Sequence, residues 1–245
     1  MDRLTAIILA AGKGTRMKST DTNKVALKIH GKPMLARTIQ ILRSAGIDSI
    51  VVVVGFAKES VTSLLDDKII VAEQTEQLGT GHAVVSSLSK VPIDKESVLI
   101  IYGDDSFLYS PSIFQQLCKT HVEHNAKVTF ITMDSTTPYG FGRIVRDGAG
   151  EVVGIVEEKN ATEEQKKISE INLGCYVIDK KYLEENIKDI NKNSVTGEYY
   201  ITDIIDIIAH HRGKIAAYKL RDARWHGVNT VQDLSEAESL FADEE

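Results

Sequence analysis

The chain has 245 residues, of which 42% are hydrophobic and 26% charged, a composition typical of a globular domain with a sizeable core. It contains no apolar run near the roughly 20 residues of a membrane-spanning helix, and its first residues lack the pattern of a secretory signal. The formal net charge of −6 excludes a general attraction to nucleic acid, so an anionic ligand must be bound by a local group of cations.

Over the first 135 residues, short β-branched runs alternate with amphipathic helical patterns. Residues 50–54, IVVVV, are apolar without alternation, which is typical of a strand covered on both faces. Strands are predicted at 5–10, 50–54, 69–72, 98–101 and 128–133, and helices at 33–45, 58–65, 81–88 and 111–124. This alternation indicates an α/β fold in which helices flank a mixed, mostly parallel sheet.

The pattern changes after Thr137. In GRIVRDGAGEVVGIVEE, two alternating runs surround a turn at 147–150, which predicts a β-hairpin. Helices are then predicted at 162–167, 180–187, 200–210 and from 230 onward, and strands at 171–178, 215–220 and 225–228. We expect a single domain over residues 1–245, with halves at 1–135 and 136–228 and a C-terminal helix at 229–245.

Cysteine and histidine spacing argues against a structural metal site. Cys118 and Cys175 lie 57 positions apart, which indicates neither a disulfide framework nor a zinc site, and we expect a reducing, cytoplasmic location. The histidines are not expected to bind metal: we predict surface positions for His121, His124, His210 and His211, and a structural role for His226. Among the aromatic residues, we predict packing for Trp225, and either packing or contact with a ligand for Tyr199 and Tyr200.

The segment that follows the first strand is rich in glycine and cations. Gly12 and Gly14 allow close approach of the backbone to a ligand, and the nearby cations can bind a polyphosphate. A solvated basic face is the alternative. The cations are Lys13, Arg16, Lys18, Lys24, Lys28 and Lys32, all within 20 residues. The segment matches neither GxxxxGK[ST] nor GxGxxG, so it predicts neither a Walker loop nor a dinucleotide site.

Two further segments carry polar groups to the ends of predicted strands. In EQTEQLGTGHAVVSSL, the amides of Gln74 and Gln77 can pair with the edge of a base, although Thr80 could simply cap the following helix. In LIIYGDDSFL, a strand delivers Asp104 and Asp105 to its carboxyl end, where carboxylates can hold Mg²⁺ or merely form a turn.

Nine motifs in one order resemble the uridyltransferase domain of the bifunctional N-acetylglucosamine-1-phosphate uridyltransferase and glucosamine-1-phosphate acetyltransferase family. More broadly, the chain is similar to the sugar-1-phosphate nucleotidyltransferases, from about residue 4 to 235. The motifs are IILAAGKGTRMKS with NKVALKIHGKPML, EQLGTGHA, YGD, GRIVRD, GIVEEKNAT, ISEINLGCYV, GEYYITDII and GVNT. The resemblance implies a Rossmann-like nucleotide-diphospho-sugar transferase fold, with a nucleotide-binding half at 1–135 and a sugar-binding half with a small β lobe at 136–228.

The resemblance also implies roles for individual residues. Catalytic roles fall to Arg16 and Lys24, and the two Mg²⁺ ligands are Asp104 and Asn229. Nucleotide contacts are implied for Leu9, Ala10, Ala11, Gly12, Lys13, Gln74, Gln77, Gly79, Thr80 and Tyr102. Contacts to the sugar phosphate are implied for Gly142, Glu157, Asn172 and Thr202.

Three positions depart from the family pattern. Asn23 stands where the family commonly has proline before the lysine, so the loop is expected to be less rigid. Asp105 stands where an apolar residue is common, and we expect its side chain to face solvent, with metal binding as the alternative. Leu173 replaces a threonine of the motif EINTG, which removes a hydroxyl expected near the sugar pocket.

The resemblance implies an enzyme, a sugar-1-phosphate nucleotidyltransferase that uses Mg²⁺. The leading hypothesis is uridylyl transfer from UTP to N-acetyl-α-D-glucosamine 1-phosphate. The alternatives are a UTP- or dTTP-dependent glucose-1-phosphate nucleotidyltransferase and a regulatory module that binds nucleotide without turnover. We expect no membrane or nucleic acid partner. The chain ends at SLFADEE without the hexapeptide repeats of a left-handed β-helix, so acetyltransferase activity is not expected.

Overall fold

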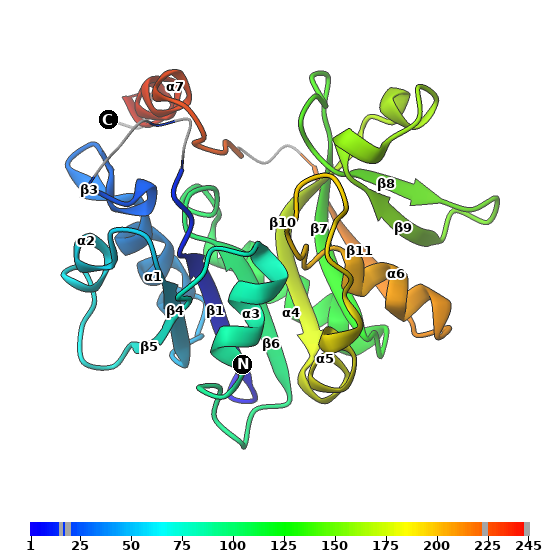
Figure 1. Cartoon of the computed structure of the whole chain (residues 1–245), viewed down its shortest axis with the longest axis horizontal. Coiled ribbons are helices and arrows are strands. Elements are labelled where there is room, and N and C mark those ends of the chain that lie inside the picture. Colours follow the sequence, from blue (N-terminus) through cyan, green and yellow to red (C-terminus); the bar gives the residue numbers. More distant parts are fainter. Residues whose placement is uncertain (15–16, 18–20, 222–224, 243–245) are drawn as a thin grey trace.

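The computed structural model describes residues 1–14, 17, 21–221 and 225–242, and its centre is a twisted sheet (Figure 1). Among the described residues, nine strands form this sheet, in the order β11-β7-β10-β6-β1-β4-β5, with β8 paired to β10 and β9. The strands are β1 (Leu4–Ala10), β4 (Ile50–Val54), β5 (Ile70–Glu73), β6 (Ser97–Tyr102), β7 (Val128–Asp134), β8 (Arg143–Arg146), β9 (Val152–Val156), β10 (Glu170–Asp179) and β11 (Ile215–Leu220). A small ribbon pairs β2 (Lys28–Ile29) with β3 (Lys32–Pro33).

Most neighbouring strands of the sheet's central path run parallel. β1 is parallel to β4 and β6, β4 to β5, and β7 to β11, whereas β10 is antiparallel to both of its neighbours β6 and β7. This arrangement confirms the predicted mixed, mostly parallel sheet. It also brings the carboxyl ends of β1, β4 and β6 to one edge, where ligands bind in open α/β sheets.

Helices cover both faces of the sheet because its strands are apolar on both sides. On one face, Ile8 packs in a cluster with side chains of α1 and α4, including Leu42 and Phe114. On the other face, Ile7 packs with side chains of α3, α5 and α6, including Ile205. The helices are α1 (Met34–Ser44), α2 (Lys58–Thr62), α3 (Thr80–Leu88), α4 (Pro111–Glu123), α5 (Lys180–Asn186), α6 (Asp203–His210) and α7 (Val231–Ala242).

Two predicted elements do not form as expected. The helix predicted at 162–167 is reduced to a 3₁₀ turn, Gln165–Lys167, because the segment is too short to offset the cost of nucleating an α-helix. The strand predicted at 225–228 is irregular chain that leads into α7. There Trp225 packs edge-on against Phe141, with ring centroids 5.3 Å apart, so the predicted packing of the indole is confirmed.

One histidine prediction is wrong. His121 lies on the inner face of α4 and is only 7% exposed, because its ring contacts the Thr129 hydroxyl of β7 at 3.0 Å. The other three histidines of the two pairs, His124, His210 and His211, are exposed as expected. Within the described residues, no helix combines the length and the apolar character that a bilayer crossing requires.

Candidate active site

A cavity of about 440 Å³ opens at the carboxyl ends of β1 and β6. All ten predicted nucleotide-contacting residues line it, together with Lys24, Asp104 and Asn229. Gly14, expected to let the backbone approach a ligand, lines it too, and four lining residues had no assigned contact in the sequence analysis: Asn23, Val25, Ala83 and Glu198. Asn23 was noted only as a departure, and Glu198 lies in the motif GEYYITD, from which only Thr202 was assigned. Arg16, the second predicted catalytic residue, lies outside the described residues.

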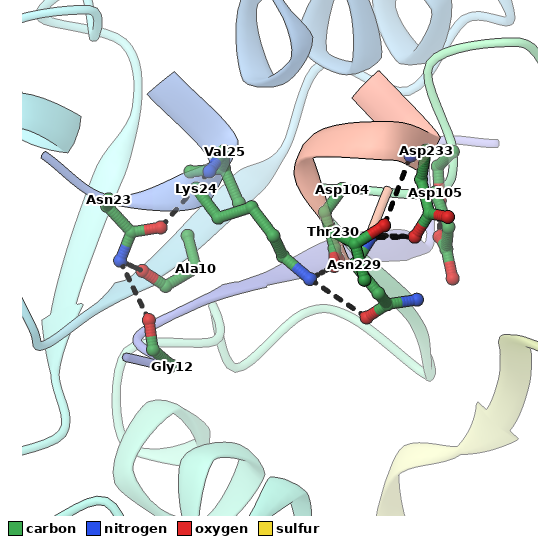
Figure 2. A network of polar contacts seen from close by, with 11 residues as sticks. Ala10, Gly12, Asn23, Lys24, Val25, Asp104, Asp105, Asn229, Thr230 and Asp233 are labelled. Atoms are coloured by element: carbon green, nitrogen blue, oxygen red, sulfur yellow. Dashed lines mark hydrogen bonds and ion pairs between the residues drawn. The ribbon is translucent and has the colours of Figure 1, made fainter. Parts of the chain in front are cut away.

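The Lys24 ammonium group joins the two predicted metal ligands. Its Nζ donates to Asn229 Oδ1 at 3.1 Å and forms an ion pair with the Asp104 carboxylate (Figure 2). The two side chains of this ion pair are largely buried, at 14% and 18% exposed. A carboxylate oxygen and an amide oxygen therefore already converge on one cation, and this donor set fits Mg²⁺, which prefers a few oxygen ligands from protein.

A capping box at the start of α7 places Asn229 beside Asp104. The Asp233 carboxylate accepts the backbone N–H groups of Asn229 and Thr230 at 2.7 and 2.8 Å, and the Thr230 hydroxyl accepts the N–H of Asp233 at 3.1 Å. Burial opposes the charge of Asp233, but these hydrogen bonds hold its pKa below the ordinary value. Because the N–H of Val228 also donates to the Asp104 carbonyl at 3.1 Å, the two ligands are held by backbone contacts.

Asn23 is buried against the glycine turn, with 1% of its surface exposed. Its amide nitrogen donates to the carbonyls of Ala10 and Gly12, and its amide oxygen accepts the N–H of Val25 (Figure 2). The amide nitrogen also donates to the carbonyl of Phe56. The side chain thus connects three segments, which argues against the expectation that asparagine makes this loop less rigid.

The loop before α3 is held by Gln74 and by the segment that precedes α6. Gln74 Nε2 lies 3.0 Å from both the Gly79 carbonyl and the His82 ring. The Thr80 hydroxyl accepts the N–H of Ile201 at 3.0 Å and does not cap α3, so the simple capping interpretation is wrong. Gly79 has φ +100°, and a Cβ there would lie 2.5 Å from the Tyr199 carbonyl oxygen. Both the positive φ and the close approach of the Tyr199 carbonyl therefore require glycine at this position.

Asp105 was expected to face solvent, but it does not. Its carboxylate is half-buried, accepts a hydrogen bond from Ser106 Oγ at 2.9 Å, and lies near Gly174. Burial and the neighbouring Asp104 raise its pKa well above the ordinary value. The ring of Tyr102 packs directly against Gly174, and a Cβ at that position would lie only 2.3 Å from a ring carbon.

The four residues predicted to hold the sugar phosphate form a second group, on β10 and in the segments that precede β8, follow β9 and precede α6. The Thr202 hydroxyl donates to Glu157 at 3.1 Å, and the N–H of Asn172 donates to the Gly142 carbonyl at 2.9 Å. A Cβ at Gly142 would lie 3.6 Å from the Glu157 carboxylate and 3.7 Å from Asn172 Cβ, so all four are neighbours. Burial raises the pKa of Glu157, and the Thr202 hydroxyl partly offsets this.

Leu173 does not reach this group. It packs with Ile171 and Cys175 in the cluster beneath α1 and α4, whereas Tyr176, the hydrogen-bond partner of Asn172, packs on the opposite face of the sheet. Because side chains alternate along β10, a hydroxyl at this position would lie in the core, away from Asn172. The expectation that it would lie near the sugar pocket is therefore wrong.

The chain is similar to the N-terminal parts of longer proteins. It is 43% identical over 237 residues to the bifunctional protein GlmU of Streptococcus agalactiae, covering 96% of this chain and 51% of that protein. It is 45% identical over 209 residues to the bifunctional protein GlmU of Carboxydothermus hydrogenoformans, covering 85% of this chain and 46% of that protein. The chain thus spans about half the length of the curated relatives it matches.

A solved structure shares the fold. It is described as a glucose-1-phosphate thymidylyltransferase from Bacillus anthracis, with a TM-score of 0.81, 22% identity, and coverage of 98% of this chain and 96% of that chain. At this identity the likeness shows the fold alone, and it confirms the predicted Rossmann-like architecture. The family model described as nucleotidyl transferase matches residues 5–244, and this protein belongs to the nucleotidyl transferase family.

Proposed function

We propose that this chain transfers a uridylyl group from UTP to N-acetyl-α-D-glucosamine 1-phosphate, releasing pyrophosphate and forming UDP-N-acetylglucosamine. The observation that carries the proposal is the contact of Lys24 with both Asp104 and Asn229 beside the cavity of the glycine turn. The nine colinear motifs and the similarity to GlmU proteins over nearly the whole chain support the same activity.

The main obstacle to this reaction is the approach of two anions. A phosphate monoester is already a nucleophile, so no side-chain nucleophile is required, and positioned cations overcome the repulsion. In this proposal Lys13 and Arg16 bind the triphosphate, and Lys24 stabilises charge where the α-phosphate meets the sugar phosphate. Asp104 and Asn229 hold Mg²⁺, which when bound neutralises charge on the α-phosphate and the leaving pyrophosphate.

The remaining residues orient the two substrates. The segment around Gln74, Gln77 and Gly79 selects the base, and Gln74 with the backbone around Gly79 favours a pyrimidine. The neighbouring group of Glu157, Asn172, Thr202 and Gly142 holds the amino sugar. The two free cysteines favour a reducing, cytoplasmic location.

A substrate panel tests the proposal. Purified protein is offered UTP, dTTP, CTP and ATP with N-acetylglucosamine 1-phosphate or glucose 1-phosphate, and pyrophosphate release is measured. We expect UTP with the N-acetylated sugar to give the highest kcat/KM. A higher value for glucose 1-phosphate, with either UTP or dTTP, would replace the sugar assignment, and no turnover with any pair would favour a nucleotide-binding regulatory module.

Asp104→Ala tests the metal assignment. We expect turnover to fall at least about 10³-fold because the only charged ligand is lost. The fold should be retained, since the contact of Asp104 with Val228 uses the backbone carbonyl. Asp134→Asn, which breaks an exposed ion pair with Lys219, is the control and should leave turnover unchanged. Full activity of the Asp104 variant would remove the metal assignment.

A further inference from the structure

We propose that Asn23 is the positioning residue that fixes Lys24 relative to the nucleotide-binding turn, and this inference rests on the proposed function. The resemblance assigns no role to an asparagine at this position. In the structure, however, its side chain is only 1% exposed, and it bonds both to the turn at Ala10 and to the backbone N–H of Val25, next to Lys24 (Figure 2).

The amide nitrogen of Asn23 ties the turn to a second strand end. Nδ2 lies 3.0 Å from the carbonyl oxygen of Ala10, at the end of β1, and 3.2 Å from that of Gly12. It also lies 2.9 Å from the carbonyl oxygen of Phe56, which follows β4. All three partners are acceptors, so only the nitrogen of the amide can face them, and the orientation of the side chain is unambiguous.

The amide oxygen and the backbone of Asn23 anchor the segment that carries Lys24. Oδ1 accepts the N–H of Val25 at 3.1 Å and so caps the 3₁₀ turn Lys24–Ala26. The backbone N–H of Asn23 donates to Ser60 Oγ at 2.9 Å, and the Ser60 hydroxyl donates to the Ala57 carbonyl at 2.7 Å. Lys24 is thus held between two neighbours whose backbone N–H groups are both bound.

These bonds connect the proposed triphosphate-binding turn to Lys24 through one side chain. The carbonyls of Ala10 and Gly12 belong to the turn proposed to hold the triphosphate, and the capped turn fixes the Cα of Lys24. A displacement of about 1 Å in such a constellation can cost 10²-fold in rate. Proline could not reproduce the bonds, because it lacks both the amide group and the backbone N–H that Ser60 accepts.

A graded set of variants separates the two halves of the Asn23 amide: the nitrogen, which bonds to the three carbonyls, and the oxygen, which accepts the N–H of Val25. Asn23→Ser keeps an oxygen that can accept the Val25 N–H but cannot reach the carbonyls, so we expect KM for UTP to rise about 10-fold while kcat stays within about 3-fold. Asn23→Ala loses both halves, and we expect kcat to fall about 30-fold in addition. Asn23→Pro should resemble Asn23→Ala.

A double-mutant cycle tests whether Asn23 acts through Lys24. If it does, Asn23→Ala should change kcat less than about 3-fold when Lys24 is already alanine. A merely structural role would give the full 30-fold effect in both backgrounds, and that result would overturn the proposal.

Asn186 provides the matched control. It is also buried, at 9% exposed, and its Nδ2 donates to the Tyr182 carbonyl at 2.8 Å on α5. Asn186→Ala should lower the melting temperature as Asn23→Ala does, but leave KM and kcat unchanged. Equal kinetic changes in the two alanine variants would also overturn the proposal.

Calorimetric titration with UTP separates this test from the test of the proposed function. If wild-type protein turns over a different nucleotide and sugar pair, the substrate assignment fails and the cycle is repeated with the reactive pair. If no pair reacts, the Kd for UTP carries the test. Asn23→Ser should then weaken binding about 10-fold and Asn186→Ala should not, and equal values for wild type and Asn23→Ser would overturn the proposal.

Discussion

Lys24 contacts the same two oxygen donors that the proposed magnesium ion would use, Asp104 and Asn229. Without metal, the ammonium group balances the Asp104 carboxylate and prevents an unpaired charge in a largely buried position. In the proposed reaction, Asp104 and Asn229 would hold Mg²⁺ with these oxygens, so the ion would compete with Lys24 for them. A Lys24 ammonium group that gave up one of these partners would be available to phosphate oxygens.

His121 makes the stability of the fold depend on pH. Burial lowers its pKa from 6.5 to about 4, Lys127 contributes in the same direction, and Asp179 opposes it. Since the folded protein disfavours the protonated ring, its stabilising contribution is complete above pH 6.5 and is lost as pH falls towards 4. Allowing for solvent near the ring, we expect a loss of about 2 kcal/mol over this range relative to His121→Gln. Urea unfolding at both pH values measures it, and parallel pH curves for the two proteins would contradict the prediction.

Residue-scale prediction from sequence depended on whether the partner was local. Asp104 and Lys24 line the cavity, as expected from the short local motifs YGD and NKV. The burial of His121 depends on Thr129 in the next strand, and the role of Asn23 depends on Phe56, which is 33 positions away. A residue-by-residue pattern contains no information about such partners, so these side chains were misjudged.

The capping box of α7 is the element that holds Asn229. Asp233→Ala removes the acceptor for the N–H groups of Asn229 and Thr230, so we expect about 1 kcal/mol lower stability from the lost cap. The Mg²⁺ concentration for half-maximal turnover should rise about 10-fold as Asn229 loses its fixed position. Gln232→Ala, in the same turn but bonded only to Glu236 among the contacts described, is the control and should leave the Mg²⁺ requirement unchanged. Equal Mg²⁺ curves for the two variants would contradict this role.

The close approach of Gly79 to Tyr199 joins the start of α3 to the segment before α6. Gly79→Ala would place a methyl group against the Tyr199 backbone and force an alanine to adopt φ +100°. We expect at least about 2 kcal/mol lower stability and weaker UTP binding, measured by thermal unfolding and calorimetry. Gly148→Ala, in the turn between β8 and β9 with no atom within 4 Å of the added carbon, should cost much less. Similar losses in the two variants would argue against the steric explanation.

Elements with a strong local pattern were predicted best. The strands at 50–54 and 215–220 have the predicted bounds. For 50–54 the reason is a run of β-branched residues that is buried throughout, which has few alternatives to a central strand. The strand predicted at 225–228 failed although its composition is apolar. Trp225 and Val228 are buried or half-buried through contacts with Phe141 and the cluster beneath α7, which satisfy the apolar side chains without strand pairing.

At the scale of the whole molecule, β10 connects the two predicted halves. It lies between β6 and β7, both of the first half, and pairs with each. A register shift between Asn172 and Tyr176 interrupts its pairing with β7. That irregular stretch carries Gly174 beneath Tyr102 and Asn172 beside Gly142. The same strand therefore supports both the cavity and the sugar-phosphate group. The boundaries at 135 and 228 remain predictions, and the sheet is continuous across the first of them.

The contact between Lys24 and Asn229 joins positions 205 residues apart, and this separation bears on the order of folding. Contacts of such long range form late, because the intervening chain must be ordered first. Trp225, the only tryptophan, lies just before Asn229 and reports the docking of that segment. On refolding, we expect far-UV circular dichroism to recover before tryptophan fluorescence, and catalytic competence to return with the fluorescence. Simultaneous recovery of all three would mean that the last segment docks in the same cooperative step as the sheet.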